Sequence, residues 1–173
     1  MADSARPSPE EIIRYDKDPK ARIATITFDR ADQLNAPTIG ARLRYAELLH
    51  QANIDDEVKV LIIRGEGTDL GSGVDLDEFA EVYGSSATGP RLAEFGLSRD
   101  DDVRLPPARS FRGGAQTSQW FADPRSGCRT LQDFKKISIL EVKGYCYGWH
   151  FYQAADADLV ISSDDALFGH AAF

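Results

Sequence analysis

The stretch Gly144–Asp158 (GYCYGWHFYQAADAD) places an imidazole and a phenol directly after a glycine-bounded turn. Gly144 and Gly148 allow the backbone to turn sharply, so that N–H groups at the end of the turn can point toward a ligand. His150 titrates near neutral pH, and Tyr152 can donate a proton. These residue types can take part in proton transfer, although a histidine beside aromatic residues is more often a packed structural side chain.

A second glycine turn, Gly71–Asp75 (GSGVD), can present the N–H of Val74 in the same way. If the N–H groups of Val74 and Trp149 met at one point, they would form an oxyanion hole for a thioester or ester carbonyl. Each turn taken alone is equally compatible with an ordinary strand-to-helix connection. A dinucleotide site is poorly supported, because no further glycine follows Gly73 at the required spacing, and neither a P-loop nor a GxSxG sequence is present.

Both turns follow apolar, β-branched runs that are typical of buried strands. The predicted strands are 23–28 (IATITF), 58–63 (VKVLII), 137–142 (ISILEV), 159–163 (LVISS) and 166–168. An amphipathic pattern after Thr38 predicts a helix that ends near Asp55, and further helices are expected from Asp75 and after the second turn. Helices that alternate with strands predict an α/β fold with parallel strands.

The length of 173 residues suits one domain. We expect a polar leader at residues 1–20 and a core at 21–173, with an enlarged loop segment at about 84–129. That segment holds 6 of the 14 glycines, 4 of the 8 prolines, and seven arginines against five acids. It is interpreted as a mobile active-site loop or as a segment with partial helix content.

The composition excludes several classes of protein. A net charge of −8 argues against binding to nucleic acid, which needs a basic face. Cys128 and Cys146, the two cysteines, form no CxxC or His/Cys cluster, so neither a zinc site nor a disulfide framework is indicated. The N-terminal residues do not resemble a signal peptide and no run reaches membrane-spanning length, so no membrane partner is expected and a cytoplasmic location is predicted.

Three blocks of the sequence, in this order, resemble the crotonase (enoyl-CoA hydratase/isomerase) superfamily. Residues 23–37 (IATITFDRADQLNAP) resemble its first strand and the connector written NRPxxxNA. Residues 55–79 (DDEVKVLIIRGEGTDLGSGVDLDEF) resemble the block that supplies the first oxyanion donor. Residues 135–173 (KKISILEVKGYCYGWHFYQAADADLVISSDDALFGHAAF) resemble the block that supplies the second donor.

The resemblance implies an α/β fold built as a spiral of β-β-α units, here without the C-terminal helices of the family. It implies an acyl-CoA substrate, with coenzyme A as part of that substrate and no tightly bound cofactor, and assembly as a homotrimer or hexamer if the full fold is present. It also implies an oxyanion hole made by the N–H groups of Val74 and Trp149. The substrate- or CoA-binding residues that it implies are Arg30, Gly73, Asp75 and Gly148.

Two glutamates that act in the hydratases of this family are absent from the sequence. Counted along the family motifs, Tyr152 stands at the first position and Ala172 at the second. A tyrosine hydroxyl with an ordinary pKa of about 10 is mostly protonated at pH 7, so Tyr152 suits a donor better than a base. His150 and His170 are the remaining candidate bases, and each is also compatible with a packed, hydrogen-bonded role.

Two lysines that are common in the CoA site of the family are replaced by Gln33 and Asp77. Arg30 and the arginines of residues 84–129 are candidate phosphate partners in their place. The alternative is that these arginines simply form a solvated, charged loop.

The leading prediction is therefore an enoyl-CoA hydratase/isomerase-like enzyme with non-standard catalytic side chains, Tyr152, His150 and His170. A hydrolase, decarboxylase or C–C lyase acting on a CoA thioester is the alternative within the family. A non-catalytic acyl-CoA-binding or assembly module, or an inactive fragment, is the alternative from another class, because the family continues into helices beyond the position of Phe173.

Overall fold

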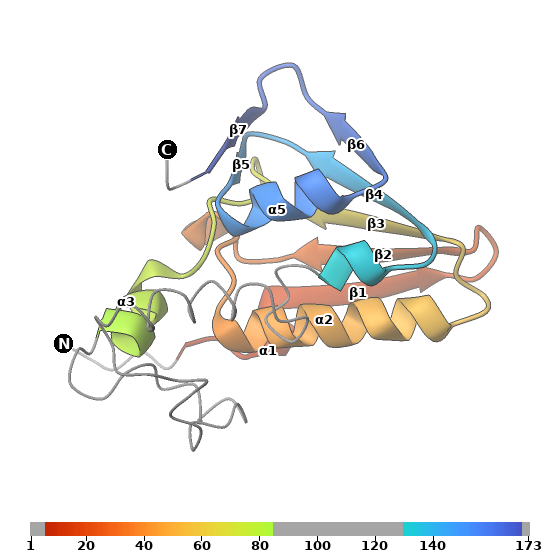
Figure 1. Ribbon diagram of the computed structural model, residues 1–173, viewed down its shortest axis with the longest axis horizontal. Coiled ribbons are helices and arrows are strands. Elements are labelled where there is room, and N and C mark those ends of the chain that lie inside the picture. Colours follow the sequence, from red (N-terminus) through yellow and green to blue (C-terminus); the bar gives the residue numbers. More distant parts are fainter. Residues whose placement is uncertain (1–5, 85–129, 171–173) are drawn as a thin grey trace.

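The computed structural model describes residues 6–84 and 130–170, and its main feature is a five-stranded sheet (Figure 1). The strands lie in the order β1 (Ile13–Asp18), β2 (Ile23–Phe28), β3 (Val60–Gly65), β4 (Ile137–Val142) and β6 (Leu159–Ser162). β1 pairs antiparallel with β2, whereas each of the other pairs is parallel. The predicted α/β organisation with parallel strands is confirmed.

Two helices share a core with this sheet. Figure 1 shows α2 (Ile39–Ile54) running along β1 and β2, and α5 (Trp149–Asp156) in front of the upper strands. The Phe28 ring of β2 has its centroid 5.8 Å from that of Tyr45 in α2 and 5.5 Å from that of Trp149 in α5. Thr38 begins α2 as predicted, since its hydroxyl accepts a hydrogen bond from the Ala41 N–H at 3.1 Å.

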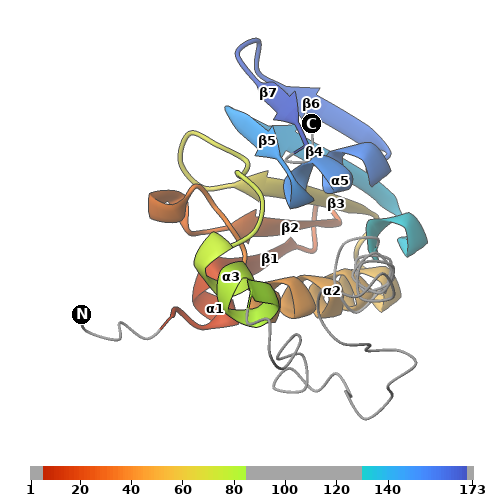
Figure 2. The same ribbon diagram turned by 60° about the vertical axis from the view of Figure 1, so that its left-hand side comes forward.

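A second, two-stranded sheet consists of β5 (Tyr145–Tyr147) and β7 (Leu167–Gly169), which are parallel. The shorter helical elements are α1 (Pro9–Ile12), η1 (Ala31–Gln33), α3 (Leu76–Gly84) and η4 (Thr130–Asp133). Figure 2 shows α3 in front of the N-terminal end of α2. A hydrogen bond joins these two helices, because the Glu78 carboxylate accepts the Ile39 N–H at 2.5 Å.

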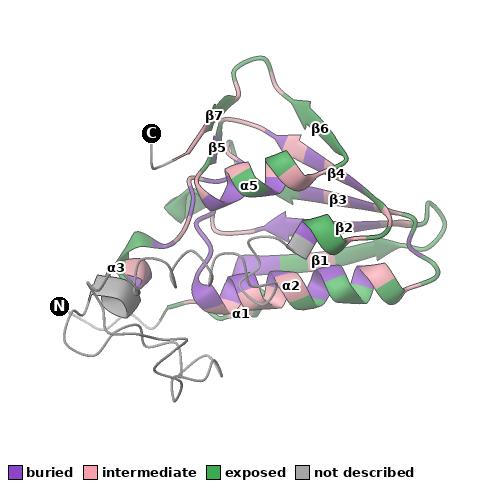
Figure 3. Ribbon diagram, viewed as in Figure 1, coloured by how far each residue is buried: buried purple, intermediate pink, exposed green. Residues whose placement is uncertain are grey.

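Burial is uneven along the chain (Figure 3). The inward side chains of β2, β3 and β4 are buried, whereas all four residues of β6 are exposed. Of the twelve large hydrophobic side chains that are exposed in the described residues, nine lie between Ile137 and Phe168. The region around β6 and β7 therefore presents an apolar surface.

Most predicted elements agree with the structure, but the expected polar leader at residues 1–20 is wrong for its second half. Residues 9–18 form α1 and β1, and Ile12 and Ile13 are fully buried. The sequence pattern of β1 was missed because the strand has only two inward-facing apolar residues, Ile13 and Tyr15, and its other residues are charged. The sequence also gave no sign of β5, which occupies three residues inside the predicted glycine turn.

The predicted loop segment lies outside the described residues from position 85 to 129. Within the described part of the chain, no helix is both long and apolar enough to cross a membrane.

Candidate active site

The two glycine turns lie against each other. The Gly71 N–H donates to the Tyr145 carbonyl at 2.8 Å, and the Tyr147 N–H donates to the Gly71 carbonyl at 2.9 Å. Gly73 and Gly148 both have positive φ, at 121° and 56°. A Cβ atom on Gly148 would lie only 3.2 Å from the Gly73 Cα, so this close approach needs glycine.

The two predicted oxyanion donors flank this contact. Val74 directly follows Gly73, and Trp149 is the first residue of α5, where N–H groups have no partner within the helix. Across the residues that the structure describes, neither N–H donates to a backbone carbonyl. A Cβ atom on Gly73 would lie 4.0 Å from the Trp149 nitrogen, so the two donor segments are close neighbours.

Tyr152 and His170 are brought together from different elements. Tyr152 lies on the outer side of α5, and His170 follows β7. The Tyr152 hydroxyl is hydrogen-bonded to His170 Nε2, and the two ring centroids are 5.0 Å apart with an angle of 67° between the planes. Tyr152 is 40% exposed, so this pair is accessible to a ligand. Ala172, at the second glutamate position, lies outside the described residues.

His150 lies elsewhere, fully buried beneath the first turn. Its ring packs edge-on against Phe28 and Trp149, and a Cβ atom on Gly71 would lie 2.2 Å from its Cε1. Burial lowers the pKa of His150 to about 3, and neither ring nitrogen has a hydrogen-bond partner among the described residues. The structure therefore keeps this imidazole neutral and does not bring it to Tyr152 and His170.

Arg30 and Asp75 form a partly buried ion pair beside the first turn, with Nη1 and Oδ2 2.6 Å apart. Arg30 also donates to the Ala36 carbonyl, and Asp75 accepts the Glu78 N–H at 2.8 Å, which caps the start of α3. Burial alone would raise the pKa of Asp75, but the Glu78 N–H and the Arg30 guanidinium hold it below its usual value. Both residues were expected to contact the ligand, and the structure pairs them with each other.

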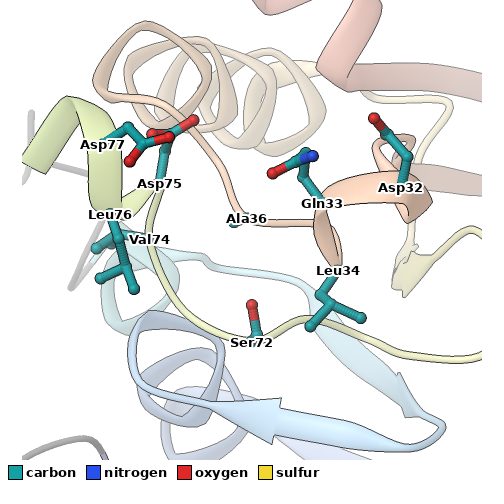
Figure 4. Close-up of a pocket in the computed structure, with 9 residues that line it drawn as sticks. All are labelled: Asp32, Gln33, Leu34, Ala36, Ser72, Val74, Asp75, Leu76 and Asp77. Carbon is teal, nitrogen blue, oxygen red and sulfur yellow. The ribbon is translucent and has the colours of Figure 1, made fainter.

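A pocket of about 260 Å³ opens beside this ion pair (Figure 4). One wall comes from the connector at residues 32–36, and the other comes from the first turn and the start of α3, at residues 72–77. Val74, the first predicted donor, lines this pocket. The pocket therefore lies beside the turn that carries this predicted donor.

Asn35 holds the connector in place, a role that was not predicted from the sequence. It is fully buried, has a left-handed φ of 54°, and donates to the carbonyls of Glu66 and Asp69 at 2.9 and 2.8 Å. Its side-chain oxygen accepts the Arg30 N–H at 3.0 Å. A signal was available, because asparagine is one of the few residues that tolerate this backbone conformation.

Nothing in the described part of the chain gathers three potential metal ligands of the His, Cys, Asp or Glu type.

Known proteins resemble this chain in sequence and in structure. The provisionally named enoyl-CoA hydratase EchA13 of Mycobacterium tuberculosis is 29% identical over 165 residues, which are 95% of this chain and 49% of that protein. The hydroxycinnamoyl-CoA hydratase-lyase of Pseudomonas fluorescens is 26% identical over 148 residues, covering 85% of this chain and 44% of the relative. The chain thus spans about half the length of these curated relatives. No family model matches it.

The fold also matches solved structures. The crystal structure of an enoyl-CoA hydratase/isomerase from Xanthobacter autotrophicus superposes with a TM-score of 0.65 at 23% identity, covering 92% of this chain and 48% of that one. Sequence relatives and solved structures together point to the enoyl-CoA hydratase/isomerase (crotonase) superfamily. The predicted resemblance is confirmed, and the chain has a partial crotonase fold, consistent with its N-terminal part.

Proposed function

We propose that this protein acts on an acyl thioester, with coenzyme A as part of the substrate, through an enolate held by two backbone N–H groups. The hydrogen bond between Tyr152 and His170 carries this proposal, because it joins a proton donor to a base at the surface of α5. The names of the curated relatives, an enoyl-CoA hydratase and a hydroxycinnamoyl-CoA hydratase-lyase, support the substrate class. No tightly bound cofactor is needed for this chemistry.

In the proposed step, the thioester oxygen lies between the N–H groups of Val74 and Trp149. The Tyr152 oxygen takes a proton from Cα of the acyl group while the Tyr152 hydroxyl proton passes to His170 Nε2. The electrons of the C–H bond form the enolate, and its negative charge falls on the oxygen that the two N–H groups face. Reversal of these transfers returns a proton to the acyl group. The bond that forms or breaks next to the enolate determines the product.

With Tyr152 and His170 as a single acid–base pair, rapid hydration of crotonyl-CoA is not expected. Hydration needs a base for water and an acid for Cα at the same time. His150, the other candidate base, is buried and has its pKa lowered to about 3, so we assign it no role in proton transfer. Elimination or cleavage next to an enolate needs only the one acid–base pair and is the reaction class that we favour.

The test is exchange of the α-protons of butyryl-CoA in deuterated water, followed by mass spectrometry. The wild-type protein should catalyse the exchange, and Tyr152→Phe should slow it by at least about 100-fold. Tyr145→Phe is the matched control, since Tyr145 is also an exposed tyrosine but lies on β5. An exchange rate that is unchanged in Tyr152→Phe would remove the pair from the mechanism.

Self-association is the second candidate property, and the exposed apolar side chains around β6 and β7 support it. We propose that this surface takes part in assembly, either as a trimer or hexamer of an enzyme or as a non-catalytic module. Ile161, which is 61% exposed, is the most direct probe. Sedimentation velocity should detect an oligomer that Ile161→Lys dissociates, and a wild-type chain that sediments as a monomer would contradict this part of the proposal.

A further inference from the structure

The two edges of the five-stranded sheet carry different side chains. β1 forms one edge, and four of its six residues are charged, namely Arg14, Asp16, Lys17 and Asp18. β6 forms the other edge, with the sequence LVIS and no charged residue. Charged side chains on an edge strand hinder the addition of a further strand, whereas an uncharged, apolar edge permits it. β6 is therefore the edge of this sheet that is suited to pairing.

β6 is uncovered on both of its faces. Leu159 and Ile161, which point to one face of the sheet, are 54% and 61% exposed, and Val160 on the opposite face is 41% exposed. Figure 3 shows the strand as exposed along its length. Within the described residues, no strand pairs with the outer edge of β6. A partner strand placed there would remove apolar surface from water as well as form backbone hydrogen bonds.

The direction of the backbone groups shows which residues of β6 can bond to such a partner. The Ser163 N–H donates to the Val142 carbonyl at 3.0 Å, and so points toward β4. The N–H and C=O groups of successive residues in a strand point to opposite sides, so those of Ile161 also face β4 while those of Val160 and Ser162 face outward. The outer edge thus offers donors and acceptors from two residues, one on each side of Ile161.

This arrangement is complementary to itself. If two copies of β6 lie antiparallel about a two-fold axis at Ile161, Val160 of each copy lies opposite Ser162 of the other. Each of these two residue pairs can exchange both of its N–H···O=C bonds, since all four residues present these groups outward. Ile161 then faces its counterpart directly, and the paired residues bring no like charges together because the strand is uncharged.

We propose that β6 is an interaction edge for a second copy of this chain, and that antiparallel pairing of two β6 strands continues the sheet across a two-fold axis. The contact is isologous, so it joins chains in pairs. This inference rests on the self-association proposed above and deepens it, because it names the strand, the residues and the geometry of the contact.

Cysteine cross-linking of the full 173-residue chain tests the geometry. A Cys128→Ser background leaves the buried Cys146 as the remaining native cysteine. Ile161→Cys should form a disulfide-linked dimer in most of the chains under mild oxidation, because Cα atoms at this position of an antiparallel pair lie about 4.5 Å apart. Non-reducing gel electrophoresis measures the product.

Leu159→Cys is the matched control, since Leu159 is exposed on the same face of the same strand. In the proposed pairing its two copies lie about 14 Å apart, four residues out of register, which exceeds the roughly 7 Å limit between the Cα atoms of a disulfide. Leu159→Cys should therefore give less than about a tenth of the product that Ile161→Cys gives.

Val160→Pro tests the hydrogen bonds. Proline is tolerated on an edge strand where the N–H faces away from the sheet, so this variant should keep the pairing with β4 and a urea midpoint close to that of the wild type. It removes an outward donor that the second copy needs. The dissociation constant of the dimer, measured by sedimentation velocity, should rise by at least about tenfold.

The outcomes separate this inference from the broader proposals. A wild-type chain that associates while Ile161→Cys and Leu159→Cys cross-link equally, or while Ile161→Cys does not cross-link, would overturn the inference and leave self-association in place. Association that is unchanged in a folded Val160→Pro variant would also overturn it. A wild-type chain that sediments as a monomer would overturn both, and the exchange of butyryl-CoA α-protons tests the catalytic proposal independently of all three.

Discussion

The first glycine turn and the Tyr152–His170 pair lie in the same candidate site, but the protein holds them in different ways. At the turn, Gly71 packs on the buried His150 ring, and Asn35 fastens the facing connector with three hydrogen bonds. The Tyr152–His170 pair is partly exposed, and its members contact each other through a hydrogen bond and an edge-on ring contact. The proposed backbone donors thus follow a turn that packs on the core, whereas Tyr152 lies at the surface.

The difference shows how a chain with a partial crotonase fold can carry Tyr152 where the family resemblance places a glutamate. A backbone N–H remains in place whatever side chain it carries, as Trp149 illustrates, because its side chain turns into the core and packs on Phe28 and Tyr45. Tyr152, three residues later on α5, projects outward instead. The core therefore constrains the first position and leaves the second free to carry different chemistry.

The largest effect on stability is expected for Gly71→Ala. The added Cβ would lie 2.2 Å from the buried His150 ring, so the free energy of unfolding should fall by about 3 kcal/mol or more. Urea denaturation of the wild type and the variant measures this loss. In a His150→Ala background the same substitution should cost much less, because the ring that it meets is gone, and equal costs in both backgrounds would show that His150 is not the obstacle.

Protonation of His150 in acid should lower the free energy of unfolding by a slightly smaller amount than Gly71→Ala does. The folded-state pKa of about 3 lies below the ordinary value of 6.5, so the unfolded chain binds this proton first. The contribution of the neutral imidazole is therefore complete above pH 6.5 and is lost as the pH falls toward 3, by about 3 kcal/mol at pH 4. Denaturation at pH 7 and pH 4 should show a smaller pH dependence in His150→Phe than in the wild type, and identical dependences would contradict the burial of a neutral ring.

Asn35→Ala should lower the free energy of unfolding by about 2 kcal/mol, because it removes three partly buried hydrogen bonds, with the carbonyls of Glu66 and Asp69 and with the Arg30 N–H. Asn53→Ala provides the comparison, since the Asn53 side chain accepts a single hydrogen bond, from the Lys135 N–H, in an exposed position. Its cost should stay below about 1 kcal/mol. Equal losses in the two variants would indicate that the connector is not held more firmly than the surface.

Tyr152→Phe should have the smallest effect on stability, below about 0.5 kcal/mol, because it removes one hydroxyl from a partly exposed surface. The same variant should nearly abolish α-proton exchange. A variant that loses more than 2 kcal/mol would place Tyr152 among the residues that hold the fold, and the contrast between the two regions would fail.

The strands that position the site were predicted from the sequence more accurately than the contacts of its side chains. β2 and β4 have the predicted bounds, because their β-branched, largely apolar runs are flanked on both sides by charged residues. The Arg30–Asp75 pair could not be predicted, since 45 residues separate the partners and only the fold brings them together. From the sequence, His150 and His170 were equally good candidate bases. The structure distinguishes them, because the side of α5 that carries His150 faces the core.

The helical periodicity of α5 places His150 on its buried side, and this alone would have distinguished His150 from His170. Trp149, His150 and Gln153 are the buried residues of this helix, and they share one side at the spacing of a helical turn. Tyr152 falls outside that set. The contact between Tyr152 and His170 still required the position of β7, which pairs with β5 through Tyr147 and Gly169.

The most direct test of the account is a double-mutant cycle on the exchange of butyryl-CoA α-protons in deuterated water, using Tyr152→Phe, His170→Ala and both together. If the two residues pass one proton between them, each single variant should lose nearly all of the catalysed exchange, and the double variant should be no slower than the slower single variant. Independent losses that multiply in the double variant would contradict a shared role. Exchange that persists in all three variants would show that the catalytic group lies elsewhere.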